Sequence, residues 1–158
     1  PLHFTGPLQR NKVKQVVGKV ALIQSVGSVA LLDEIEKTAE KLDIVQDILL
    51  EVNIGGEEAK SGFTPQELEE AARYAVSLAH VRVLGLMTIP PVEKQPHGNM
   101  PFFTRMRELF VDINQKIYDN KLKYLSMGMS GDYAEAIEAG SNMVRVGTAI
   151  FGARNYSK

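Results

Sequence analysis

The feature that most constrains the fold is a regular alternation of short apolar runs with longer stretches of helical periodicity. The apolar runs are rich in β-branched residues, as is typical of strands that are buried on both faces. Strands are predicted at residues 2–5, 21–25, 47–54, 81–89, 123–128 and 143–150. Helices are predicted between them, at residues 8–18, 28–42, 65–80, 101–119 and 132–139. This alternation predicts an α/β protein with a parallel sheet covered by helices.

Two helix ends and one loop carry clear local signals. Thr64, Pro65 and Glu67 form a capping box with a proline in the first turn of the predicted third helix. Gly140 follows the helical stretch "DYAEAIEA", at the position where a glycine commonly ends a helix. The stretch "TIPPVEKQPHGNMP" (88–101) is rich in proline and polar residues, so it is predicted to be a long loop.

Length and charge limit the classes of protein that the chain can belong to. Its 158 residues suffice for one domain with a hydrophobic core, so a single domain is predicted over residues 1–158. A net charge of −1 gives no general attraction to nucleic acid or to anionic membranes, and neither is a predicted partner. The chain has no cysteine, which excludes disulfides and fits a cytoplasmic protein. The three histidines are dispersed and predict no metal site.

Two architectures satisfy the alternation: an open doubly wound sheet and a (β/α)8 barrel. No GxGxxG motif follows the first predicted strand, so the nucleotide-binding form of the open sheet has no direct support. The last two predicted strands lead into "SMGMSGD" and "GTAIFG", at the loops where barrels of this type bind phosphate. A barrel needs eight strands and six are predicted, so two βα units would precede Pro1 on this interpretation.

A single cation interrupts the last apolar run, "MVRVGTAIFG" (143–152). Burying Arg145 in a strand is unfavourable unless the guanidinium is paired or faces a ligand. Side chains alternate along a strand, so Arg145 and Gly147 are predicted to share the barrel interior, and Val144 and Val146 to point outward.

Four segments, in this order along the whole chain, resemble one family, that of the pyridoxal phosphate homeostasis proteins. The segments are "HFTGPLQRNK" (3–12), "LLEVNIGGEEAKSGF" (49–63), "VLGLMTIP" (83–90) and "LSMGMSGDYAEAIEAGSNMVRVGTAIFGARNY" (125–156). These proteins are similar to the N-terminal barrel of alanine racemase. The resemblance implies a (β/α)8 barrel of that type, represented here by about six βα units. It also implies binding of pyridoxal 5′-phosphate (PLP) and a role in vitamin B6 and amino-acid homeostasis, without robust catalysis.

The resemblance assigns roles to four residues near the C-terminus. Ser126, Gly147 and Thr148 would form the phosphate cradle, and Arg145 would donate to the pyridine nitrogen. Taken without the resemblance, the "GT" pair is equally consistent with a turn at the end of a strand. Arg145 could likewise form a structural ion pair or extend its guanidinium to solvent.

Weaker candidates lie at other predicted strand ends. His3 and Gly6 either line the cofactor pocket or, for His3, form a hydrogen-bonded part of the core. Asn53 and Met87 lie either at the rim or within the barrel interior. Ser130, together with the two residues after it, is expected to cap the following helix and not to touch a ligand.

The family's Schiff-base lysine lies in its first strand, in an "SK" motif, and this sequence has no counterpart. The chain therefore resembles the C-terminal two-thirds of such a protein. We expect a PLP carrier or regulator that serves PLP-dependent apo-enzymes and is monomeric when the full chain is present. The alternative is a fragment of a barrel-type PLP-dependent amino-acid racemase or of a related enzyme. It is less favoured because no domain for a second catalytic base follows the last predicted strand.

Overall fold

A computed structural model describes residues 1–157 and shows one parallel sheet of six strands. Each strand pairs with the next strand along the chain, in the order β1-β2-β3-β4-β5-β6. The strands are β1 (His3–Phe4), β2 (Leu22–Val26), β3 (Gln46–Glu51), β4 (Val81–Met87), β5 (Tyr124–Met129) and β6 (Met143–Arg145). Within the described residues β1 and β6 do not pair with each other, so the sheet is an open, partial barrel.

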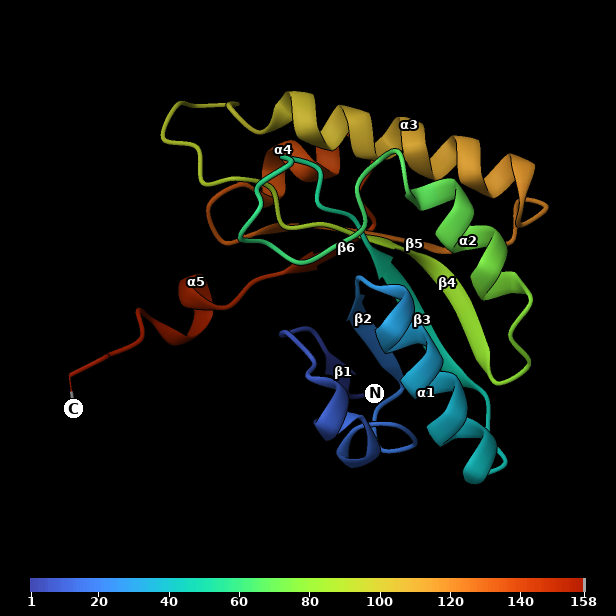
Figure 1. The fold of residues 1–158 in the computed structure, drawn as a ribbon. Coiled ribbons are helices and arrows are strands. Elements are labelled where there is room, and N and C mark those ends of the chain that lie inside the picture. The colour runs from blue at the N-terminus through green and yellow to red at the C-terminus, as the bar shows by residue number, and fades with distance from the viewer. Residues whose placement is uncertain (158) are drawn as a thin grey trace.

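The helices are η1, a short 3₁₀ helix, and five α-helices. They are η1 (Arg10–Gln15), α1 (Val29–Lys41), α2 (Leu68–Val76), α3 (Met100–Lys116), α4 (Tyr133–Glu138) and α5 (Thr148–Phe151). Figure 1 shows α1, α2 and α3 along one side of the sheet, whereas α5 and the C-terminal segment extend away from it. No helix in residues 1–157 has the length and apolar character needed to cross a membrane.

The capping-box hydrogen bonds, the glycine after α4 and the long loop are confirmed, although α2 begins only at Leu68 and Pro65 lies before its first turn. Thr64 Oγ1 accepts a hydrogen bond from Glu67 N (3.2 Å), and the Glu67 carboxylate accepts one from Thr64 N (2.9 Å). Gly140 has φ +109° directly after the C-cap of α4, a conformation that glycine adopts without strain. The segment between β4 and α3 contains no helix or strand before Met100.

Three predicted elements are wrong in extent. The helix expected over 65–80 is shorter, because α2 spans Leu68–Val76. The helix expected over 8–18 is reduced to η1, which buries Val13 and is followed by a left-handed Gly18 (φ +79°). The strand expected over 143–150 ends at Arg145, because Ile150 N and Phe151 N bond to Gly147 O (3.0 and 2.9 Å) and begin a helix. Gly147 therefore lies outside the strand and does not share a strand face with Arg145. An apolar run of this length cannot distinguish one strand from a short strand plus a helical turn.

The two faces of the sheet bury different side chains. The face toward the helices holds the main core, where α1 packs Leu32 and Ile35, and α3 packs Phe103 and Met106. The concave face holds a smaller apolar cluster of six residues. They are Leu22, Leu49 and Met87, all buried, with Leu84, Tyr124 and Met143 against them.

A second set of concave-face residues lies two positions beyond four members of that cluster. Because side chains alternate along a strand, residues two apart point to the same face. These polar residues lie one step closer to the carboxyl ends of the strands, and we call them the polar layer. The polar layer consists of Gln24, Glu51, Ser126 and Arg145. Ligand sites of parallel α/β folds lie at that end of the sheet.

Gly85 allows β4 and β5 to approach each other. A Cβ atom at this position would lie 1.8 Å from Tyr124 O, an impossible contact within a paired sheet. Gly85→Ala is therefore expected to lower the free energy of unfolding by about 2–4 kcal/mol, measured by urea denaturation. Gly131→Ala is the control, because no atom lies within 4 Å of its Cβ position. Equal stability of the two variants would contradict this account of the β4–β5 pairing.

Candidate functional site

Arg145 is held on the concave face by two neutral acceptors. Its guanidinium donates to Ser126 Oγ (2.5 Å) and to the carbonyl oxygen of Thr88 (2.8 Å). Ser126 is fully buried and in turn donates to Gln24 Oε1 (2.6 Å). Gln24 Nε2 contacts His3 Nδ1 (3.1 Å), so one hydrogen-bonded chain runs from β6 through β5 and β2 to β1.

The charge of Arg145 is balanced at longer range. The ion pairs found among the described residues do not include Arg145. Burial lowers the pKa of Arg145, and the carboxylates of Glu51 and Asp132 oppose that shift. Burial likewise raises the pKa of Glu51, opposed first by the Ser61 hydrogen bond and then by Arg145. The polar layer thus contains a cation and a carboxyl group that influence each other without direct contact.

Two backbone N–H groups after β6 converge on one hydroxyl. Gly147 N and Ala149 N both donate to Ser130 Oγ, each at 3.2 Å. Of the three residues expected to cap α4, Asp132 holds the N-cap position, but no side chain caps the helix. The Asp132 carboxylate instead accepts from Met129 N in the preceding turn (2.8 Å). Nothing lies within 4 Å of the Cβ position of Gly147, so an oxygen-bearing group can approach this backbone. Convergent N–H groups of this kind suit a phosphate oxygen.

The predicted cradle residues occupy different surroundings. Ser126, expected in the phosphate cradle, lies within β5, where both of its side-chain hydrogen bonds stay inside the polar layer. Gly147 and Thr148 are exposed at the start of α5. The structure thus brings Ser126 together with Arg145, and joins Gly147 to Ser130 instead. Cofactor contacts by these residues stay predictions.

The weaker candidates all have partners within the fold. His3 is hydrogen-bonded to Gln24, and the carbonyl of Gly6 accepts from Ser25 Oγ (2.6 Å). Met87 is fully buried in the concave apolar cluster. Asn53 shapes the loop after β3, because its Nδ2 donates to Glu57 O (2.8 Å) and its Oδ1 accepts from Glu57 N (3.3 Å).

Sequence reasoning missed four residues of the site. Gln24 and Glu51 carry the same signal as Arg145, a polar side chain inside a buried strand. Thr88 contributes a main-chain carbonyl and has no side-chain signal for that role. Ser130 accepts hydrogen bonds from Gly147 N and Ala149 N, which lie 17 and 19 residues later in the sequence. Contacts over this separation are visible only in the folded chain.

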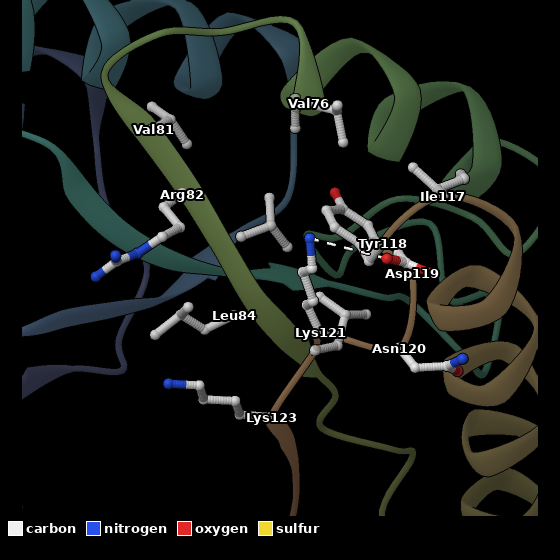
Figure 2. A pocket seen from close by; sticks show the side chains of 13 residues that line it. Val76, Val81, Arg82, Leu84, Ile117, Tyr118, Asp119, Asn120, Lys121 and Lys123 are labelled. Atoms are coloured by element: carbon white, nitrogen blue, oxygen red, sulfur yellow. Dashed lines mark ion pairs between the residues drawn. The ribbon is translucent and has the colours of Figure 1, made fainter.

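A hollow in the described residues lies away from this site. It encloses about 760 Å³ at the amino ends of β4 and β5, between the end of α2 and the loop after α3. Figure 2 shows Lys121 and Asp119 beside each other in the loop that borders it. Lys121 Nζ lies 3.9 Å from Asp119 Oδ2. Arg82 at its edge is already paired with Asp47 (2.6 and 2.9 Å). This hollow is at the opposite end of the strands from the polar layer and is not part of the candidate site.

Comparison with known proteins identifies the family. Residues 1–155 match the family model described as alanine racemase, N-terminal domain. The pyridoxal phosphate homeostasis protein of Aquifex aeolicus is 51% identical over 98% of this chain and 67% of its own length. The chain belongs to the pyridoxal phosphate homeostasis protein family. It spans about two-thirds of the length of that relative.

Solved structures confirm the fold. PipY of Synechococcus elongatus, solved without PLP, is 31% identical with a TM-score of 0.88, over 95% of this chain and 70% of PipY. PipY with PLP bound is 30% identical with a TM-score of 0.84, over 95% of this chain and 69% of PipY. The alanine racemase of Clostridium difficile shares the fold at 15% identity and a TM-score of 0.70, over 99% of this chain and 41% of the racemase. The prediction of a partial barrel of the alanine racemase type is confirmed.

Gln24 is expected to hold the polar layer together. Gln24→Ala removes the acceptor of Ser126 and the partner of His3, which leaves buried polar groups unsatisfied. We expect the free energy of unfolding to fall by about 1–3 kcal/mol in chemical denaturation. Gln115→Ala, on an exposed position of α3, is the control and should change it by about 0.5 kcal/mol or less. A Gln24 variant as stable as this control would show that the network adds no stability.

Proposed function

We propose that this chain binds PLP on its concave face and serves as a PLP carrier or regulator in vitamin B6 and amino-acid homeostasis. One observation carries the proposal. Arg145 is a half-buried cation whose hydrogen bonds go to neutral acceptors, so its charge remains available to an anionic ligand. The PLP-bound structure of the related PipY supports the choice of ligand.

The residues present fit the functional groups of PLP. Its phosphate needs N–H and hydroxyl donors, which Gly147 N, Ala149 N and the Thr148 hydroxyl would supply beside Ser130. A guanidinium has five N–H groups, so Arg145 keeps further donors for the ring nitrogen while it binds Ser126 and Thr88.

The chemistry that PLP supplies when bound is electron withdrawal by its pyridine ring. Arg145 would restrain this property, because a permanently charged donor beside the ring nitrogen does not readily give up a proton. Such a contact suits storage of the cofactor better than catalysis. Three points stay predictions within this proposal. They are that the protein serves PLP-dependent apo-enzymes, that it is monomeric and that it is cytoplasmic.

Arg145→Gln tests the proposal. The variant keeps a polar side chain but loses the charge, and we expect the Kd for PLP to rise by about tenfold to a hundredfold in isothermal titration calorimetry. Arg82→Gln is the matched control, because Arg82 is an exposed arginine at the amino end of β4, away from the polar layer. Circular dichroism verifies that both variants are folded. Unchanged affinity and unchanged PLP absorbance in Arg145→Gln would refute the role of Arg145, and absence of PLP binding by the parent protein would refute the function.

A further inference from the structure

The carboxyl group of Glu51 is not used by the proposed function, and its surroundings are unusual. Glu51 is the last residue of β3, and only 7% of it is exposed. The hydroxyl of Ser61 lies 3.3 Å from each carboxylate oxygen and is the side-chain hydrogen-bond partner among the described residues. A buried carboxylate usually accepts several hydrogen bonds or pairs directly with a cation. Glu51 has one long-range cation and one weak donor.

The position of Glu51 places it in the layer where the ligand is expected. Its strand register aligns it with Met87 on β4, which aligns with Ser126 on β5. Ser126 in turn binds Arg145. Glu51 also lies close to the loop after β2, because a Cβ atom on Gly27 would be 3.3 Å from Glu51 Oε2. The carboxyl group is thus enclosed by protein on the same concave face as Arg145.

The groups that face Glu51 divide by charge. Arg145 on β6 is the charged group that acts on it, and Ser61 in the loop after β3 is neutral. Asp132 in the loop before α4 acts on Arg145 from another side. An anionic ligand that approaches Arg145 therefore competes with two carboxyl groups that act on the same cation without direct contact.

We propose that Glu51 is a further residue of the cofactor site, which balances the charge of Arg145 in the free protein and takes up one proton when PLP binds. This inference rests on the proposed function. The proton comes from solvent and converts the carboxylate into a carboxylic acid, with no other bond made or broken.

The direction of the effect follows from Coulomb repulsion and linkage. The phosphate of PLP is anionic, so an ionised Glu51 weakens its binding and a protonated Glu51 does not. By reciprocity, bound PLP makes protonation of Glu51 more favourable. Burial has already raised the pKa of Glu51, which reduces the free-energy penalty of that step near neutral pH. The Kd for PLP should therefore fall as the pH is lowered toward the pKa of Glu51.

Calorimetry with PLP measures the proton directly. Titrations at several pH values, in buffers of different ionisation enthalpy, give the number of protons taken up per PLP bound. Glu51→Gln should remove the part of the uptake that Glu51 supplies, and should flatten the dependence of Kd on pH. If binding shifts the pKa of Glu51 by about one unit, Kd above that pKa should fall about tenfold in the variant. Glu70→Gln, an exposed carboxylate on α2, is the control and should behave as the parent protein does.

The outcomes separate the two proposals. Absence of PLP binding by the parent protein would overturn the proposed function and the inference with it. PLP binding with equal proton uptake in the parent and in Glu51→Gln would overturn the inference and leave the proposed function standing. Failure of Glu51→Gln to fold would also overturn the inference, because the ionised carboxylate would then be a structural requirement.

Stability without PLP gives a second measurement. The pKa of Glu51 in the folded protein is raised above its ordinary value of 4.5, so protonation favours the folded state. That contribution is present below pH 4.5 and is lost as the pH rises through the folded-state pKa. Glu51→Gln should therefore be more stable than the parent above that pKa, and the difference should shrink on acidification. A difference that is independent of pH would overturn the inference.

Discussion

The hydrogen bond from Arg145 to Ser126 is the interaction on which the concave face depends. It secures β6 to β5, and through Gln24 it reaches β2 and His3 on β1. A guanidinium that is partly withdrawn from water is ordinarily neutralised by a carboxylate in direct contact. Here a hydroxyl and a carbonyl fix its orientation, while Glu51 and Asp132 act from farther away. The guanidinium of Arg145 is thus held in place by hydrogen bonds and forms no salt bridge within the described residues.

Alternation along the strands separates this polar layer from the apolar cluster beneath it. Leu22, Leu49, Tyr124 and Met143 each precede a polar-layer residue by two positions. The same backbone geometry therefore places most of the apolar cluster on one level and the polar side chains on the next, although Met87 of the cluster aligns with Glu51 and Ser126. Stability comes mainly from the cluster and from the helix-covered face. The polar layer can then retain incompletely satisfied groups, which a ligand site requires.

Much of this arrangement was predictable from the sequence, and the failures have identifiable physical causes. The six strands and the unusual Arg145 follow from periodicity and from the free energy of burying charge. The split of 143–150 into β6 and α5 does not follow, because both elements are apolar and short. Ser130 was assigned to a cap because its local sequence fits one. Its actual partner, Gly147, is distant along the chain. Glu51 carries the same sequence signal as Arg145, a charged side chain within the apolar run "LLEVN".

Ser130 has a consequence for how firmly any cargo is retained. The N–H groups of Gly147 and Ala149 already share its hydroxyl as their acceptor. An incoming oxygen would exchange one acceptor for another, so the net gain in hydrogen bonding is small. On departure, the two donors find a replacement at once and are never left unsatisfied. A phosphate site of this kind would favour rapid release of the ligand over very tight binding.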